Sequence, residues 1–224
     1  MNSYKKPYYS EKEVRFALKQ IYIHGPKDIS YYLLAHMILV RGDKLEDLIA
    51  LRVSDVSEYL KRNNTYLGQL IKNQIKDREP GDFFLGDTKT GLVSETVCVT
   101  FSRISKKCNM DISYRSFYKT YLFDKLLEVQ SPICMPIATL RYPGRLCDYM
   151  GITKEEYRAI LSGTSNYKPF LHNMFWADLG NDVANLIRYL EEYQRRTDSY
   201  TGDILTLQEC VRELSALFNS YYKH

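Results

Sequence analysis

Apolar side chains recur at helical spacing along most of the chain. Residues 10–13, Ser-Glu-Lys-Glu, form a capping box, in which the Ser10 hydroxyl and the Glu13 carboxylate are three residues apart. The box predicts the start of a helix, and Gly25-Pro26 predicts its end. The apolar face of this helix is formed by Val14, Ala17, Leu18 and Ile21.

The same patterns predict helices over most of the remaining sequence. These helices are expected at about residues 29–40, 45–51, 58–78, 94–107, 116–129, 154 onward, 176–196 and 206–222. The helix at 29–40 is apolar on nearly every side, which predicts that it is buried. Two further capping boxes, Thr153 with Glu156 and Thr206 with Glu209, mark helix starts.

One short segment has the composition of a strand. Phe83-Phe84-Leu85 follows a turn at residues 79–82, and residues 87–91 are predicted to form another turn. Pro132, Pro136 and the Pro143-Gly144 pair predict a looped stretch. The predicted fold class is therefore mainly α with a small β element.

Composition narrows the class of protein. A chain of 224 residues, 45% of them hydrophobic, suits one domain or a domain with an extension. Apolar runs fall well short of the roughly 18 residues of a membrane span, and the N-terminus lacks the apolar core of a signal peptide. We therefore expect a cytoplasmic protein without a membrane partner. The five cysteines include no C-x-x-C pair and the four histidines lack metal-ligand spacing, so neither a metal site nor a cofactor is expected.

The net charge of +4 conceals a strongly basic segment. Residues 101–145 contain eight basic and three acidic residues, which leaves the rest of the chain slightly acidic. Aromatic residues are interleaved with the basic ones: Tyr114, Phe117, Tyr118, Tyr121 and Tyr142. This combination is typical of nucleic-acid contact. An ordinary solvated helix face is the alternative explanation.

Three segments resemble the catalytic domain of tyrosine recombinases, the phage integrases. Residues 9–56 resemble the opening of that domain, and within them residues 47–56, Asp-Leu-Ile-Ala-Leu-Arg-Val-Ser-Asp-Val, are similar to the family's capped run ending Leu-x-x-Ser-Asp-Val. Residues 112–120 resemble its His-x-x-Arg segment, and residues 149–156 resemble the segment that begins at its nucleophilic tyrosine. The resemblance covers about residues 8–160. It implies a tyrosine-recombinase-like fold.

The resemblance also implies roles for particular residues. Tyr149 occupies the position of the nucleophile that attacks a DNA phosphodiester and forms a phosphotyrosyl linkage. The family's other catalytic positions are degenerate, because they fall on Lys44, Arg115, Tyr118 and Tyr142. The strand hairpin with a catalytic lysine is expected to be reduced or missing, since the predicted helix follows directly after residue 57. A free phenol has a pKa of about 10, so attack would require a base and cations around the phosphate.

We therefore predict a DNA-binding protein of a mobile element, such as a plasmid, phage or integrative element, with a degenerate active site. The expected partner is double-stranded DNA, and the residues expected to contact it are Lys44, Arg103, Lys106, Lys107, Arg115, Lys119, Arg141 and Arg145. Two alternatives stay open. One is an active atypical recombinase or relaxase-like strand transferase that uses Tyr149, and the other is a non-catalytic helical interaction module.

The predicted organisation is a recombinase-like domain at residues 8–164 with a C-terminal helical extension at 165–224 packed on it. An apolar stripe in the extension suits packing within the chain or self-association: Leu207, Val211, Leu214 and Phe218. The cysteines are expected to be buried thiols, and Cys147, beside the basic loop, is the one whose reactivity is worth testing.

Overall fold

The computed structural model describes residues 8–26, 29–60 and 66–176. The chain divides into two compact units, residues 1–63 with 67–171 and residues 64–66 with 172–224. Nearly all described residues belong to the first unit. The predicted boundary at residue 164 stays a prediction, and the predicted helix at 206–222, together with nearly all of the one at 176–196, lies outside the described residues.

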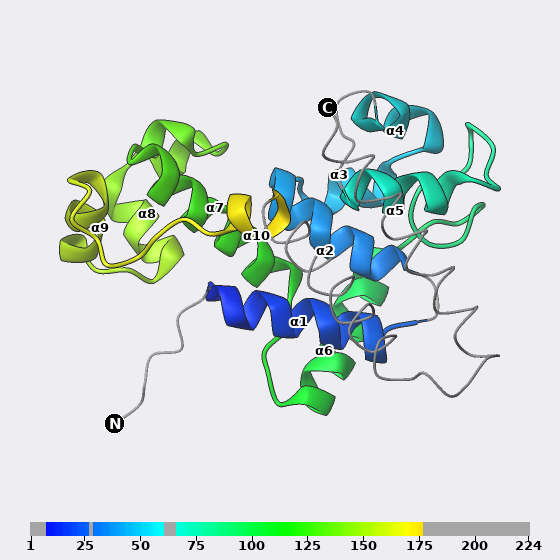
Figure 1. Cartoon of the computed structure of the whole chain (residues 1–224), viewed down its shortest axis with the longest axis horizontal. Helices are drawn as coiled ribbons and strands as arrows, with labels where there is room; N and C mark the ends of the chain where they lie inside the picture. Colours follow the sequence, from blue (N-terminus) through cyan, green and yellow to red (C-terminus); the bar gives the residue numbers. More distant parts are fainter. Residues whose placement is uncertain (1–7, 27–28, 61–65, 177–224) are drawn as a thin grey trace, which may run out of the picture. The chain divides into compact units, whose positions relative to one another are not determined.

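The described residues are mainly helical (Figure 1). The elements are α1 (Glu11–His24), α2 (Ser30–Arg41), α3 (Leu45–Ala50), α4 (Val53–Leu60), α5 (Tyr66–Ile75), α6 (Ser94–Cys108), α7 (Tyr114–Val129), η1 (Pro132–Cys134), η2 (Ala138–Arg141), α8 (Pro143–Met150), α9 (Lys154–Leu161) and α10 (Leu171–Trp176). This confirms the mainly α class.

The N-terminal helices form as their sequence patterns predict. Ser10 and Glu13 complete the capping box of α1, and the predicted apolar face of that helix is buried. The helix α2 is buried along most of its length, which confirms the prediction from its apolar sequence. It packs against α1 on one side and against α7 on another.

The long helix α7 connects two groups of elements in the first unit (Figure 1). Its contacts include α2 and, toward its C-terminal end, η1 and α9, while α8 packs against η2 and α9. Tyr8 packs with the group formed by η1, η2, α8 and α9, because its ring stacks on Phe123 of α7 with 3.9 Å between centroids. Thr153 and Glu156 complete the capping box of α9, as predicted.

The helix predicted at 58–78 is wrong in its start. The helix α4 begins at Val53, because the Asp55 carboxylate at its third position accepts the backbone N–H of Arg52 at 2.8 Å. A second helix, α5, begins at Tyr66. The Ser-Asp sequence that ends the 47–56 segment therefore lies inside a helix.

The strand predicted at Phe83-Phe84-Leu85 is also wrong. The part of the chain described contains isolated bridges, between Arg52 and Phe83 and between Asp87 and Gly91, and no sheet. The guanidinium of Arg78 donates hydrogen bonds to the carbonyls of residues 83, 84 and 86 at 2.6 to 3.2 Å. A side chain thus takes the place of a partner strand.

The turn predicted at residues 87–91 is confirmed. Asp87 Oδ1 accepts the backbone N–H groups of Lys89 and Thr90 at 2.9 and 3.0 Å, which is an Asx turn. Together with the bridge between Asp87 and Gly91, it makes a tight reversal of the chain after α5. The expected reduction of the β element holds for the described residues.

The loop predicted around Pro143 and Gly144 is wrong as well. These residues begin the helix α8, with Pro143 at a first-turn position where its missing N–H is not needed. The preceding stretch contains the short helices η1 and η2. Tyr149 also belongs to this helix, in its last turn.

Candidate nucleic-acid interface

Tyr149 lies in the last turn of α8, which Gly151 ends in a left-handed conformation with φ of +62°. Its ring is half-buried and packs against the apolar cluster of α7, α8 and α9. Lys119 of α7 places its Nζ 4.6 Å from the centre of the Tyr149 ring, within the range of a cation–π contact. Residues thirty positions apart in the chain thus form one local site.

Arg115 extends this site along α7, because it precedes Lys119 by four residues and so lies on the same face of the helix. Its Nε donates a hydrogen bond to the Tyr114 hydroxyl at 3.2 Å. The guanidinium carbon lies 5.7 Å from the centre of the Tyr114 ring. We call Tyr114, Arg115, Lys119 and Tyr149 the α7–α8 site.

The electrostatics of this site favour a protonated phenol. Burial raises the pKa of Tyr149 above its usual value, and the nearby Arg115 opposes that shift without cancelling it. Burial lowers the pKa of Lys119, and the like charge of Arg115 adds to the effect. Nucleophilic attack needs the opposite change, a phenol pKa that is lowered toward neutrality.

Among the described residues, no base is in hydrogen-bond contact with the Tyr149 phenol. The Tyr149 hydroxyl forms no hydrogen bond with another residue of the described part. The histidines described include His36, which is buried in α2 and whose pKa is lowered to about 3 by that burial. The α7–α8 site therefore offers cations and a phenol, without a described general base in contact.

The other predicted DNA-contacting residues all have exposed side chains. They are Lys44 before α3, Arg103, Lys106 and Lys107 on α6, Arg141 at the end of η2, and Arg145 in the first turn of α8. None of these six forms a hydrogen bond or an ion pair through its side chain with another described residue. The structure brings Arg115 and Lys119 to Tyr149, and it gives Lys44 and Arg141 no such contact.

The degenerate positions Tyr118 and Tyr142 have opposite environments. The Tyr118 hydroxyl is buried without a hydrogen-bond partner among the described residues. Burial raises the pKa of Tyr118, with Tyr149 as the next contribution. Tyr142 exposes 67% of its surface immediately before α8. Neither environment resembles that of a catalytic acid or base.

Cys147 is buried, and burial raises the pKa of its thiol. The prediction of a buried thiol is confirmed for Cys147, and its raised pKa disfavours the thiolate, which is the reactive form. Cys98 on α6 is exposed instead. The described residues include no group of three or more metal-ligating side chains.

Sequence reasoning missed the pairing of Lys119 with Tyr149. The signal was present in part, since Arg115 and Lys119 are one helical turn apart. The missing information was that α8 begins at Pro143, which places Tyr149 on a helix that faces α7. Helix spacing cannot reveal such a contact between two helices.

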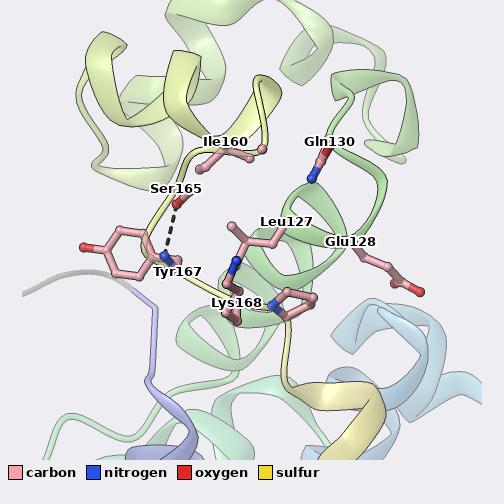
Figure 2. A pocket seen from close by; sticks show the side chains of 9 residues that line it. Leu127, Glu128, Gln130, Ile160, Ser165, Tyr167 and Lys168 are labelled. Carbon is pink, nitrogen blue, oxygen red and sulfur yellow. Dashed lines mark hydrogen bonds between the residues drawn. The ribbon is translucent and has the colours of Figure 1, made fainter.

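A cavity of about 250 Å³ lies elsewhere in the first unit, between the C-terminal end of α7 and the segment that follows α9 (Figure 2). Leu127 and Ile160 contribute apolar walls, and Gln130 and Lys168 contribute polar ones. Gln130, at the end of α7, also lies close to Gly163. None of the predicted site residues lines this cavity, so it is separate from the α7–α8 site.

Comparison with known proteins adds no family to this description. No family model, curated protein or solved structure matches the chain. Within the described residues, no helix has the length and apolar character needed to cross a membrane.

Proposed function

We propose that the chain is a DNA-binding protein with a tyrosine-recombinase-like fold, and that it holds duplex DNA through basic residues of α6, α7, η2 and α8. The observation that supports this proposal most strongly is the absence of neutralising partners. None of the eight predicted DNA-contacting residues forms an ion pair with a described carboxylate. Basic side chains without such partners are available to phosphate oxygens.

Some other basic residues of the same unit are ion-paired, although exposed lysines outside the predicted set, such as Lys12 and Lys154, form no ion pair with a described carboxylate. Arg15 pairs with Glu11, Lys89 with Asp82, and Lys125 with Glu128. Lys125 belongs to the basic segment 101–145, yet it lies outside the predicted DNA-contacting set. The positive charge of the set is therefore not balanced locally, as DNA binding requires.

The proposed origin in a mobile element comes from the resemblance of residues 47–56, 112–120 and 149–156 to the recombinase family. In this proposal Tyr149 and Lys119 form part of the DNA-contacting surface rather than a cleavage centre. The raised pKa of Tyr149 supports this choice, because a protonated phenol donates a hydrogen bond to a phosphate oxygen but does not attack it.

The test is binding of a fluorescently labelled DNA duplex, followed by anisotropy over a series of salt concentrations. The variant Arg115→Gln/Lys119→Gln should make the negative slope of log K against log salt shallower by about two, because each lost phosphate contact removes about 0.9 from its magnitude. Tyr149→Phe removes one hydrogen bond but no charge, so it should weaken binding modestly and leave the salt slope unchanged. Arg15→Gln is the matched control, since Arg15 is already ion-paired on α1.

Failure to bind any duplex at low salt would refute the proposal, because phosphate contacts are strongest there. An unchanged salt slope in the double variant would refute the assignment of Arg115 and Lys119. The helical interaction module would then be the better interpretation.

Strand cleavage is the second candidate, favoured by the two cations beside Tyr149. Incubation with a nicked suicide duplex should trap a covalent protein–DNA adduct if cleavage occurs. Tyr149→Phe should abolish that adduct. We expect no adduct in either protein, and a band present only in the wild type would establish the enzyme instead.

Self-association through residues 206–222 stays a prediction outside the described residues.

A further inference from the structure

The chain exposes an aromatic corner between η2 and α8. The sequence there is Arg-Tyr-Pro-Gly-Arg over residues 141–145, and all five residues are exposed. Pro143 begins the helix and Tyr142 precedes it in an extended conformation, with φ of −81° and ψ of 123°. A Cβ atom added at Gly144 would meet no atom within 4 Å, so the corner is open to solvent.

The exposure of Tyr142 has no structural role that the packing reveals. Its ring makes no aromatic contact, hydrogen bond or ion pair with another described residue. Tyr22 on α1 has nearly the same exposure, 68% against 67%, yet its ring packs edge-on against Tyr32 with 5.6 Å between centroids. The Tyr142 ring is therefore largely open to solvent and available to a ligand.

Two unpaired arginines lie on either side of the ring in sequence. Arg141 precedes Tyr142, Arg145 follows it by three residues, and neither has a carboxylate partner among the described residues. An exposed aromatic ring with two arginines close by in sequence suits a nucleotide, because a base can stack on the ring and phosphates can pair with the arginines. An acidic peptide would use the charges but not the ring faces.

We propose that Tyr142 is a stacking site for an unpaired nucleobase, with Arg141 and Arg145 holding the flanking phosphates. Bases in an intact duplex already stack on one another, so their faces are not accessible to the ring. The corner therefore binds single-stranded DNA or an unpaired end beside a duplex. This inference rests on the proposed DNA binding and adds a second, structure-selective contact to it.

The test compares three labelled DNAs: a single strand, the blunt duplex of the same sequence, and that duplex with a single-stranded overhang. Tyr142→Leu should weaken binding of the single strand and of the overhang about tenfold, which corresponds to ~1.4 kcal/mol. Binding of the blunt duplex should stay unchanged. Tyr142→Trp should restore the lost affinity, because indole also stacks. Tyr22→Leu is the control for loss of an equally exposed tyrosine.

Each other outcome overturns the inference in a recognisable way. Equal losses on all three DNAs would make Tyr142 a general contact, without preference for unpaired bases. If the duplex binds but Tyr142→Leu changes binding of none of the three DNAs, the stacking site is refuted and the proposed function is unaffected. No binding of any of the three DNAs at low salt would remove both.

Discussion

Gly42 is a position at which one added methyl group should destabilise the first unit. It ends α2 with φ of +70°, a conformation that L residues adopt only with strain. A Cβ atom there would lie 2.0 Å from Cε1 and 2.4 Å from Cδ1 of Tyr121 on α7. Real Cβ atoms do not approach other atoms so closely, so the ring or the loop has to move.

The expected loss of stability follows from these two causes. The left-handed conformation costs an L residue about 1–2 kcal/mol, and overpacking typically costs about 1–3 kcal/mol. Gly42→Ala should therefore lower the free energy of unfolding by about 2–5 kcal/mol, or Tm by about 4–20 °C. Urea unfolding followed by far-UV circular dichroism measures the change.

A matched control and a second variant separate the two causes. Gly144→Ala should not lower stability and should raise it by up to about 1 kcal/mol, because a Cβ at Gly144 meets open space and alanine favours a helical position. In a Tyr121→Ala background, Gly42→Ala should lose only the backbone cost of about 1–2 kcal/mol. A Gly42→Ala protein as stable as the Gly144→Ala protein would refute the reasoning.

Three further predictions concern buried and exposed groups. Brief alkylation of the native protein should modify the exposed Cys98 before the buried Cys147, as peptide mass spectrometry would reveal. Burial lowers the His36 pKa to about 3, so between about pH 6.5 and pH 3 the folded protein binds fewer protons than the unfolded protein. Stability should therefore decrease as the pH is lowered through this range, by at most ~1.4 kcal/mol per pH unit. His36→Phe should flatten that part of a profile of unfolding free energy against pH. Asp124→Ala should lower the unfolding free energy by about 1–3 kcal/mol, more than Asp124→Asn, because Asp124 Oδ1 accepts two backbone N–H groups of the segment after α9.

Local patterns predicted the helices well because their causes are local. The capping boxes at Ser10 and Thr153 formed as expected, since a hydroxyl and a carboxylate three residues apart satisfy the first N–H groups of a helix wherever it packs. The burial of α2 followed from its apolar sequence alone. None of these features depends on residues far away in the chain.

The errors arose where distant groups determine the structure. Phe83 and Phe84 have the composition of a strand, but the Arg78 guanidinium binds their carbonyls, and no composition rule predicts that replacement. The Pro143-Gly144 pair predicts a loop, but proline is also favoured in the first turn of a helix, which is where Pro143 lies. The candidate site suffered most, because the contact between Lys119 and Tyr149 depends on where α8 begins.

In the proposed function, phosphate binding at the α7–α8 site would oppose strand cleavage by Tyr149. Arg115 is the neighbour whose charge lowers the pKa of Tyr149, and burial already outweighs it. A phosphate bound by Arg115 and Lys119 would bring negative charge to the same place and would offset that favourable effect. The phenol would then hold its proton more tightly in the complex than in the free protein. If DNA binds as proposed, phosphate binding at this site would make Tyr149 a poorer nucleophile unless a base approaches.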